Sequence, residues 1–190
     1  MQHCFSGDSV FEMLTFAKIS GMSDTPTLIL NHRQIEQKIL RIATEIYENN
    51  YQESEIHLVG IADRGYVLAE RISRALAAES QQTIHLHKLH IADEFPFEGR
   101  WETPEKVAGA LEQKVVILVD DVLNSGTTLI YGTRFLLQHP LKQLITTVLV
   151  NRRHRLYPVR ADYVGLTLAT TLQEHISVAF EQGNDAVYLK

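Results

Sequence analysis

Two regular spacings of apolar residues alternate along this chain, and the clearest helical spacing follows Asn31. Four isoleucines recur there every three or four positions and make one apolar stripe: Ile35, Ile39, Ile42 and Ile46. Asn31 is a favourable N-cap residue, and Gln34 three positions later completes a capping-box pattern. The pattern predicts an amphipathic helix that runs to about Asn49.

Short and almost uninterrupted apolar runs between turn signals predict β-strands. The expected strands lie at 56–61, 83–91, 115–119, 143–150, 161–166 and 186–190. Helical spacing returns at about 65–78 and again from about 126 to 138, where Pro140 follows. Strands that are apolar on both sides and alternate with helices are typical of a parallel sheet with helices on both faces. The predicted fold class is therefore α/β.

Two segments fall outside this alternation. Residues 1–25 are predicted to be an N-terminal extension, in which 9–20 could form a short amphipathic helix, and 26–190 to be a single domain. Residues 92–113 are polar, interrupted by proline and glycine, and without periodicity. A loop of this length in a compact domain is usually a functional lid or disordered. We expect 92–113 to be a flexible loop that closes over a bound substrate.

Composition excludes several classes of protein. The 190 residues, 45% of them hydrophobic, suffice for one sizeable core. Cys4 is the single cysteine, which excludes an internal disulfide and a cysteine zinc site. No apolar run approaches the roughly 20 residues of a membrane helix, and the first residues lack a basic leader before an apolar segment. We expect a cytoplasmic protein with no membrane partner, and the net charge of −5 weighs against indiscriminate nucleic-acid binding.

The candidate chemistry lies where the apolar run 115–119 ends in two adjacent aspartates, Asp120 and Asp121. Open parallel sheets bind ligands at the carboxyl ends of their strands. The next residues offer backbone N–H groups, hydroxyls and a glycine at the start of a helix: Asn124, Ser125, Gly126, Thr127 and Thr128. Such a loop suits a phosphate monoester, whereas carboxylates bind vicinal hydroxyls or Mg²⁺. The pattern indicates a phosphorylated sugar; the alternative is that Asp121 caps the helix and Asp120 is solvated.

These residues also carry a family resemblance. Residues 115–129, VVILVDDVLNSGTTL, resemble the phosphoribosyl-pyrophosphate motif of the type I phosphoribosyltransferases, and GIADRG at 60–65 is similar to their pyrophosphate loop. Residues 29–50 and 148–165 resemble one subgroup, the bifunctional pyrimidine-operon attenuators that are also uracil phosphoribosyltransferases. The resemblance covers about 28–190, without 92–113.

The resemblance implies an enzyme that transfers a 5-phosphoribosyl group from phosphoribosyl pyrophosphate to a nucleobase and releases pyrophosphate, with Mg²⁺ as cofactor. Uracil is the leading expectation for the base. The first alternative is an RNA-binding attenuation regulator that senses nucleotide in the same pocket. The second is a phosphoribosyl-pyrophosphate-binding fold without transferase activity. We also expect a homodimer or a higher homo-oligomer, although no residue pattern specifies which.

The resemblance further assigns roles to individual residues. Asp120 and Asp121 would bind the ribose hydroxyls and the metal ion, and Asn124 to Thr128 the 5-phosphate. The pyrophosphate loop would consist of Ala62, Asp63, Arg64 and Gly65. Arg64 is a catalytic candidate with the two aspartates, because a guanidinium forks onto the oxygens of a departing diphosphate; the alternative is a surface arginine at a helix start.

Base recognition is expected under a C-terminal hood at about 160–190. The candidate residues are Arg152, Tyr163, Val164 and Gly165; alternatively, Tyr163 and Val164 are ordinary strand residues.

Departures from the family pattern leave the identity of the base open. Leu166 stands where the uracil subgroup usually has lysine, and Ala62-Asp63 stands where Lys-Thr is usual, which brings a carboxylate near an anionic leaving group. Asn124 stands where purine-specific relatives carry a general-base aspartate, so a hypoxanthine or guanine enzyme is less expected.

Two further patterns bear on RNA and metal binding. On the helix at 31–50, which the resemblance implies for RNA contact, the basic and acidic residues balance: Arg33, Lys38 and Arg41 against Glu36, Glu45 and Glu48. Leu40 and Thr44 replace a threonine and a histidine of the attenuators, so we expect no tight RNA binding.

His85 and His87 share one strand face, but without a third ligand at suitable spacing the sequence favours packing over a metal pair.

Overall fold

The computed structural model describes residues 26–190 except 96, 105–106, 108, 153–155, 170–173 and 182. The extension predicted at 1–25, with its short helix, lies outside the described residues. Three helices are described: α1 (His32–Asn50), α2 (Ala62–Glu79) and α3 (Thr127–Leu136). The described strands are β1 (Thr27–Asn31), β2 (Glu55–Ile61), β3 (Thr83–Ile91), β4 (Gly99–Trp101), β5 (Val115–Leu123), β6 (Gln143–Arg152), β7 (Tyr163–Leu168), β8 (Ile176–Ala179) and β9 (Ala186–Leu189).

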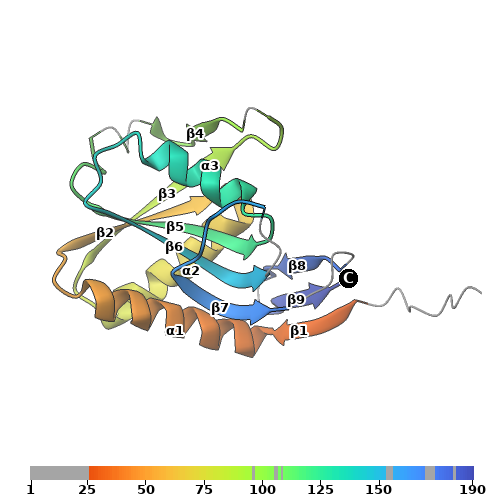
Figure 1. Cartoon of the computed structure of the whole chain (residues 1–190). Helices are drawn as coiled ribbons and strands as arrows, with labels where there is room; N and C mark the ends of the chain where they lie inside the picture. The colour runs from red at the N-terminus through yellow and green to blue at the C-terminus, as the bar shows by residue number, and fades with distance from the viewer. Residues whose placement is uncertain are drawn as a thin grey trace, which may run out of the picture.

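The main sheet of the described residues has the order β4-β3-β2-β5-β6-β7, and every pairing in it except β4 with β3 is parallel. Helices α1 and α2 cover one face and α3 covers the other (Figure 1). Strand β5 supplies side chains to both layers, because Val115, Ile117 and Val119 are buried toward α1 and α2 whereas Val116 and Leu118 are buried toward α3. This double burial explains why β5 reads as a continuous apolar run. The predicted α/β class is confirmed.

Helix α1 begins where the capping pattern predicts. The Asn31 side chain accepts a hydrogen bond from the Gln34 backbone N–H at 2.9 Å, and the Gln34 side chain accepts one from the Asn31 N–H at 2.9 Å. All four isoleucines of the predicted stripe are buried: Ile35, Ile39, Ile42 and Ile46. The stripe packs α1 onto the sheet, and thereby fixes the face of the domain that lies opposite α3.

A second, smaller sheet of order β1-β9-β8 is antiparallel and lies beside the ends of β6 and β7 (Figure 1). Of its strands only β9 was predicted. Asp185, immediately before β9, joins this sheet to both large helices: its carboxylate accepts two hydrogen bonds from Arg71 and lies 2.8 Å from His32 Nδ1. Burial opposes ionisation of Asp185, but the hydrogen bonds from Arg71 and His32 hold its pKa below the ordinary value. The segment at about 160–190 that was expected to be the hood therefore belongs to two sheets: β7 to the main sheet, and β8 and β9 to the smaller one.

Residues 99–101, inside the expected loop at 92–113, form β4 and pair antiparallel with β3. Gly99 allows this pairing close to α3, because a Cβ there would lie 2.6 Å from the Phe135 ring.

In the part of the chain that the structure describes, none of the helices has both the length and the apolar character that crossing a bilayer requires.

Candidate active site

A cavity of about 590 Å³ opens where β2, β5 and β6 end. Its lining residues are Ile61, Ala62, Asp63, Arg64, Gly65, Asp93, Asp120, Asp121, Val122, Asn124, Thr128, Arg152, His175 and Ile176. The cavity therefore joins the two segments that the sequence singled out, at 62–65 and 120–128. It also contains Asp93, from the segment after β3, and His175 and Ile176 at the start of β8, which sequence reasoning missed.

The aspartate pair lies within β5 rather than after it, because β5 continues past the predicted end at 119 to Leu123. Asp120 Oδ1 accepts a hydrogen bond from the Asp121 N–H and Asp121 Oδ1 accepts one from the Val122 N–H, both at 2.9 Å. Asp121 Oδ2 lies 3.6 Å from Arg64 Nη1, and the Asp121 side chain is 15% exposed. Each carboxylate is thus anchored by the backbone that follows it.

Burial dominates the ionisation of both aspartates. Burial, and after it the charge of Asp121, raises the pKa of Asp120 well above its ordinary value. Burial also raises the pKa of Asp121, although Arg64 opposes this effect. Two buried like charges are stabilised by a cation or by hydroxyl donors. The pair therefore suits Mg²⁺, whose preferred ligands are oxygens, and a sugar diol.

Residues 62–65 form the first turn of α2, so this helix begins three residues earlier than predicted. Ala62 has φ +47°, in the left-handed region that costs a residue with a Cβ roughly 1–2 kcal/mol. Gly65 brings the turn against β5: a Cβ there would lie 2.7 Å from the Val119 carbonyl oxygen and 3.2 Å from the Asp120 Cα. Strained backbone such as that of Ala62 clusters at functional sites, and the close approach at Gly65 sets the start of α2 beside the aspartate pair.

We expect Ala62→Gly to raise the free energy of unfolding by up to about 1 kcal/mol, because glycine adopts φ +47° without a Cβ penalty. Urea unfolding measures the change. Ala77→Gly is the matched control, since Ala77 is exposed in the same helix with ordinary helical backbone and should lose up to about 1 kcal/mol. A loss of stability in both variants would contradict the strain at Ala62.

The carboxylate of Asp63, which departs from the family pattern, has a cationic partner. Lys88 Nζ on β3 lies 2.9 Å from Asp63 Oδ1 and 3.6 Å from Glu102 Oε2. The hydrogen bond from Lys88 lowers the pKa of Asp63, and the same bond raises the pKa of Lys88. The charge of Asp63, in the first turn of α2, is therefore offset by Lys88.

The segment Asn124–Thr128 leads into α3 as predicted. Gly126 is its N-cap with φ +85°, and a Cβ there would lie 2.6 Å from Val159 Cγ1. The hydroxyls of Ser125 and Thr127 lie 2.8 Å apart, and the Ser125 carbonyl accepts a hydrogen bond from the Leu156 N–H at 2.8 Å. The first N–H groups of a helix have no intrahelical partner and favour anions. The start of α3 can therefore bind a phosphate next to the aspartate pair.

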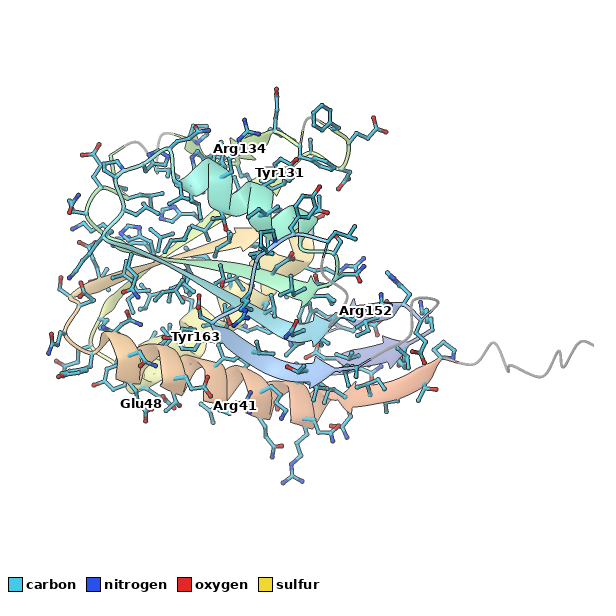
Figure 2. The ribbon with its side chains drawn as sticks, viewed as in Figure 1. Arg41, Glu48, Tyr131, Arg134, Arg152 and Tyr163 are labelled. Carbon is cyan, nitrogen blue, oxygen red and sulfur yellow. The ribbon has the colours of Figure 1, made fainter. Side chains whose placement is uncertain are left out.

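Of the four base-binding candidates, the structure brings only Arg152 into the cavity. Arg152 ends β6, is 5% exposed, and donates from Nη1 to Asn124 Oδ1 at 2.9 Å. Tyr163, Val164 and Gly165 begin β7, the edge strand beyond β6, and none of them lines the cavity, although Val164 pairs with Val148 of β6, which in turn pairs with Asp120. Figure 2 shows Tyr163 near α1 and Arg152 toward the smaller sheet.

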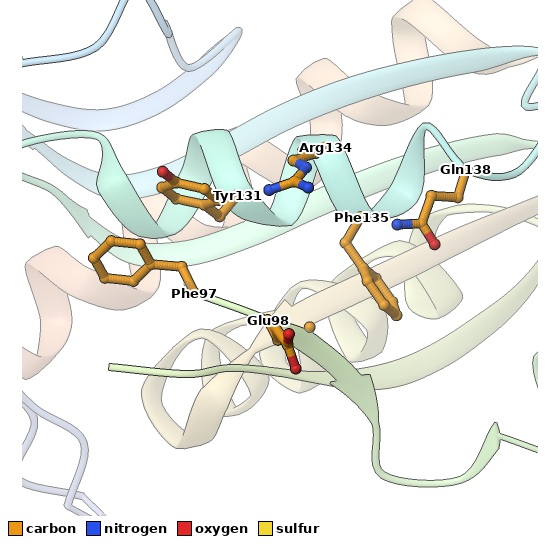
Figure 3. A pocket seen from close by; sticks show the side chains of 7 residues that line it. Phe97, Glu98, Tyr131, Arg134, Phe135 and Gln138 are labelled. Carbon is orange, nitrogen blue, oxygen red and sulfur yellow. The ribbon is translucent and has the colours of Figure 1, made fainter. Parts of the chain in front are cut away.

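A second hollow of about 360 Å³ lies between β4 and α3 (Figure 3). It is lined by Phe97, Glu98, Gly99, Tyr131, Arg134, Phe135 and Gln138. Its described lining has one carboxylate, Glu98, and belongs to the middle and end of α3 rather than to a helix start. The paired carboxylates and the helix N-terminus both favour the larger cavity as the site of chemistry.

Comparison with known proteins identifies the family. The phosphoribosyl transferase domain family matches residues 27–181. This chain belongs to the type I phosphoribosyltransferase family. It is similar to the Bifunctional protein PyrR of Herpetosiphon aurantiacus, with 34% identity over 169 residues that cover 83% of this chain and 92% of the relative. It is also 35% identical to the Bifunctional protein PyrR of Clostridium acetobutylicum over 156 residues, 79% of this chain and 88% of the relative.

Solved structures of phosphoribosyltransferases share the fold. The hypoxanthine phosphoribosyltransferase of Trypanosoma cruzi gives a TM-score of 0.70 at 16% identity, covering 85% of this chain and 95% of that chain. A hypoxanthine-guanine phosphoribosyltransferase from Bacillus anthracis gives 0.63 at 19% identity, covering 76% and 84%. The resemblance drawn from the sequence motifs is confirmed.

Proposed function

We propose that this phosphoribosyltransferase transfers the 5-phosphoribosyl group of phosphoribosyl pyrophosphate to a nucleobase, with uracil as the preferred base. The observation that carries the proposal is the buried pair Asp120 and Asp121 in one cavity with the start of α3 and the first turn of α2. The three features match the three parts of the donor: its diol, its 5-phosphate and its diphosphate.

Each group has a role that its position supports. The Asp120 and Asp121 carboxylates accept hydrogen bonds from the ribose hydroxyls. Residues 124–128 hold the 5-phosphate, and Arg64 with Ala62, Asp63 and Gly65 holds the diphosphate. The anomeric carbon–oxygen bond breaks with its electron pair on the diphosphate, a bond to the base nitrogen forms, and that nitrogen releases its proton to solvent. The chain positions the two reactants and stabilises the charge of the leaving group, so it needs no nucleophile of its own.

Magnesium fits this site because two buried carboxylates present oxygen ligands beside the diphosphate position. Asp120 and Asp121 would hold the ion directly or through water. When bound, Mg²⁺ neutralises charge on the donor phosphates. Burial, and after it the charge of Asp121, raises the pKa of Asp120, and a cation at the pair would oppose both effects.

For the base, we propose Arg152 as the principal contact, with His175 and Ile176 closing the site. Arg152 is almost fully buried and lines the cavity on the side of the smaller sheet (Figure 2). Its guanidinium can donate to a carbonyl oxygen of a pyrimidine. Tyr163, Val164 and Gly165 would act on the base only through the position of β7. The choice of uracil depends on the resemblance to the uracil subgroup.

Turnover of phosphoribosyl pyrophosphate against a panel of uracil, orotate, hypoxanthine, guanine and adenine, with Mg²⁺, tests this function. We expect nucleotide formation with uracil at the highest kcat/KM. Preference for a purine would contradict the base assignment alone. Absence of product with every base, together with measurable donor binding, would favour a binding fold without transferase activity.

RNA-binding regulation is the second candidate function, because the attenuator subgroup resembles 29–50 of this chain and relatives at 34–35% identity are named bifunctional. Arg41 is the one residue of the attenuators' small cluster on that helix that this chain retains, and it is engaged within the domain. Its Nη2 donates to the Val164 and Gly165 carbonyls at 2.5 and 3.0 Å, and its Nε lies 3.4 Å from Glu45. Figure 2 shows Arg41 on the same helix as the acidic Glu48. These contacts leave Arg41 poorly placed for a phosphate.

We therefore expect RNA binding no tighter than the roughly micromolar range of non-specific complexes at physiological salt. Gel-shift titration with pyrimidine-operon leader RNA, with and without uridine nucleotides, measures it. A scrambled RNA of equal length is the control. A nanomolar complex that uridine nucleotides strengthen would overturn this expectation and make regulation a primary function.

A further inference from the structure

A second group of titratable side chains lies on the sheet face that α3 covers, away from the active-site cavity. Glu55 and His57 open β2, and His85 and His87 belong to β3. The two strands are parallel, with His57 opposite His85. Residues two apart in a strand share a face, so all four side chains project to the same side. The cavity instead follows the far end of β2, at residues 61–65.

Three of these side chains converge at the spacing of metal ligands. Glu55 Oε2 lies 2.9 Å from His85 Nε2 and 3.5 Å from His57 Nε2. One donor atom from each of the three residues lies within 4.8 Å of the others. Around a tetrahedral zinc ion with bonds of about 2.0–2.2 Å, ligand atoms are about 3.3–3.6 Å apart. The two distances of 2.9 and 3.5 Å from the Glu55 oxygen to the histidine nitrogens are thus within a few tenths of an ångström of that separation.

The buried His57 side chain is the observation that indicates a bound ligand. It is 2% exposed, and its Nε2 has no hydrogen-bond partner in the described part of the chain. Its other nitrogen, Nδ1, lies 3.0 Å from His87 Nε2. With the proton of Nδ1 donated to His87, the Nε2 lone pair of His57 faces the Glu55 carboxylate. A cation between them would replace a repulsive contact, and a histidine ligand held through its second nitrogen is the usual arrangement at metal sites.

The surrounding groups orient the Glu55 carboxylate toward the histidines. The second oxygen of Glu55, Oε1, is held by Lys114 Nζ at 2.5 Å, which leaves Oε2 for the histidines. The rings of His57 and His85 are 16° from parallel with centroids 4.4 Å apart, so their lone pairs converge only if one ring tilts. The His85 side chain is 40% exposed, against 2% for His57, so the His85 ring has the more room to tilt.

We propose that Glu55, His57 and His85 form a binding site for a divalent transition metal, zinc in the first place, that clamps the first halves of β2 and β3. Two imidazoles and one carboxylate are a borderline-soft ligand set, which favours zinc over Mg²⁺ or Ca²⁺. Solvent supplies the fourth ligand on the side where His85 is exposed. Asp120 and Asp121, which offer oxygen ligands alone, remain the magnesium site of the proposed enzyme.

Equilibrium dialysis of the untagged, chelator-treated full chain against Zn²⁺, with the metal counted by plasma emission, tests the proposal. We expect one zinc per chain, and a visible d–d absorption band when Co²⁺ replaces it. His85→Gln and Glu55→Gln should each weaken Zn²⁺ binding at least about 10- to 100-fold. Zinc should also raise the thermal unfolding midpoint of the parent chain and leave that of His85→Gln unchanged. Both variants alter partly exposed side chains, so they are expected to fold.

Three controls separate this cluster from other donors. His90→Gln changes a histidine on the opposite face of the same strand and should keep the zinc. So should Cys4→Ser, which removes the single thiol, and the double variant Asp120→Asn/Asp121→Asn. Zinc lost in any of these controls, zinc binding by His85→Gln equal to that of the parent chain, or no stoichiometric zinc in the parent chain would overturn the proposal.

Discussion

Replacing Asp121 or Asp120 by asparagine should lower kcat/KM for phosphoribosyl pyrophosphate roughly ten- to more than hundred-fold. A hydrogen bond to a charged group contributes about 1.5–3 kcal/mol, and an asparagine amide retains the shape but not the charge. The backbone bonds survive the change, because an amide Oδ1 can still accept from the Asp121 and Val122 N–H groups. The loss should therefore come from the sugar diol and the metal ion rather than from the fold.

Stability should change in the opposite direction. Burial raises the pKa of Asp120 well above its ordinary value of 3.8, so the folded chain binds more protons than the unfolded chain between 3.8 and the raised value. Stability of the parent chain falls as the pH rises through that window, and at higher pH the ionised pair remains a cost. Asp120→Asn removes this cost. We expect the variant to be at least as stable as the parent chain at neutral pH, and less dependent on pH.

Two measurements on the same samples separate function from folding. Initial rates over a range of donor concentrations give kcat/KM, and urea unfolding at pH 5 and pH 8 gives the free energy of unfolding. Full activity in both aspartate variants would contradict the site. Lost activity accompanied by a large loss of stability at pH 8 would instead indicate that the pair supports the fold.

The parts of the fold that the sequence predicted are those in which one segment carries its own signal. Helix α1 has a cap and an apolar stripe within 19 residues, and β5 is apolar on both faces because both layers bury it. Strands β1 and β8 are five and four residues long and gain their stability from pairing with β9. Their pairing partners are distant in sequence, so no local pattern marks them.

The candidate site divides in the same way. The aspartate pair and the loop at 124–128 are contiguous, and a contiguous motif places both at one strand end. Asp93 reaches the cavity from the segment after β3 and His175 from the residue before β8, and only the tertiary structure brings them together. For Tyr163 the resemblance identified the segment, but β7 is the edge strand of the main sheet, two strands away from β5, so Tyr163 does not line the cavity.

The histidines of β3 illustrate how far a metal site can be predicted from the sequence. Spacing within HLH supplies two side chains on one face, and the sequence therefore favoured packing. The further ligands come from β2, some 30 residues earlier, through the register that sets His57 opposite His85. A register between parallel strands depends on the connection that joins them, here α2, and is not readable from either strand alone.

Gly65→Ala should lower kcat/KM by about a hundredfold and destabilise the fold by roughly 1–3 kcal/mol. The added Cβ would lie 2.7 Å from the Val119 carbonyl oxygen and 3.2 Å from the Asp120 Cα. Both obstacles are backbone atoms of β5, so the strain can be relieved only by moving the first turn of α2. That movement separates Arg64 from Asp121, and a misplacement of about 1 Å at reacting groups is sufficient for such a loss.

Gly132→Ala is the matched control, because Gly132 is also a buried helical glycine that faces β5, from α3 on the other side of the sheet. A Cβ there would lie 3.1 Å from Ile61 Cδ1 and Leu118 Cδ2, which are ends of flexible side chains. Alanine also favours a helix interior over glycine by up to about 1 kcal/mol. Gly132→Ala should thus retain activity at near-parent stability. Equal losses in both variants would show that general overpacking of β5, rather than the position of the α2 turn, causes the effect of Gly65→Ala.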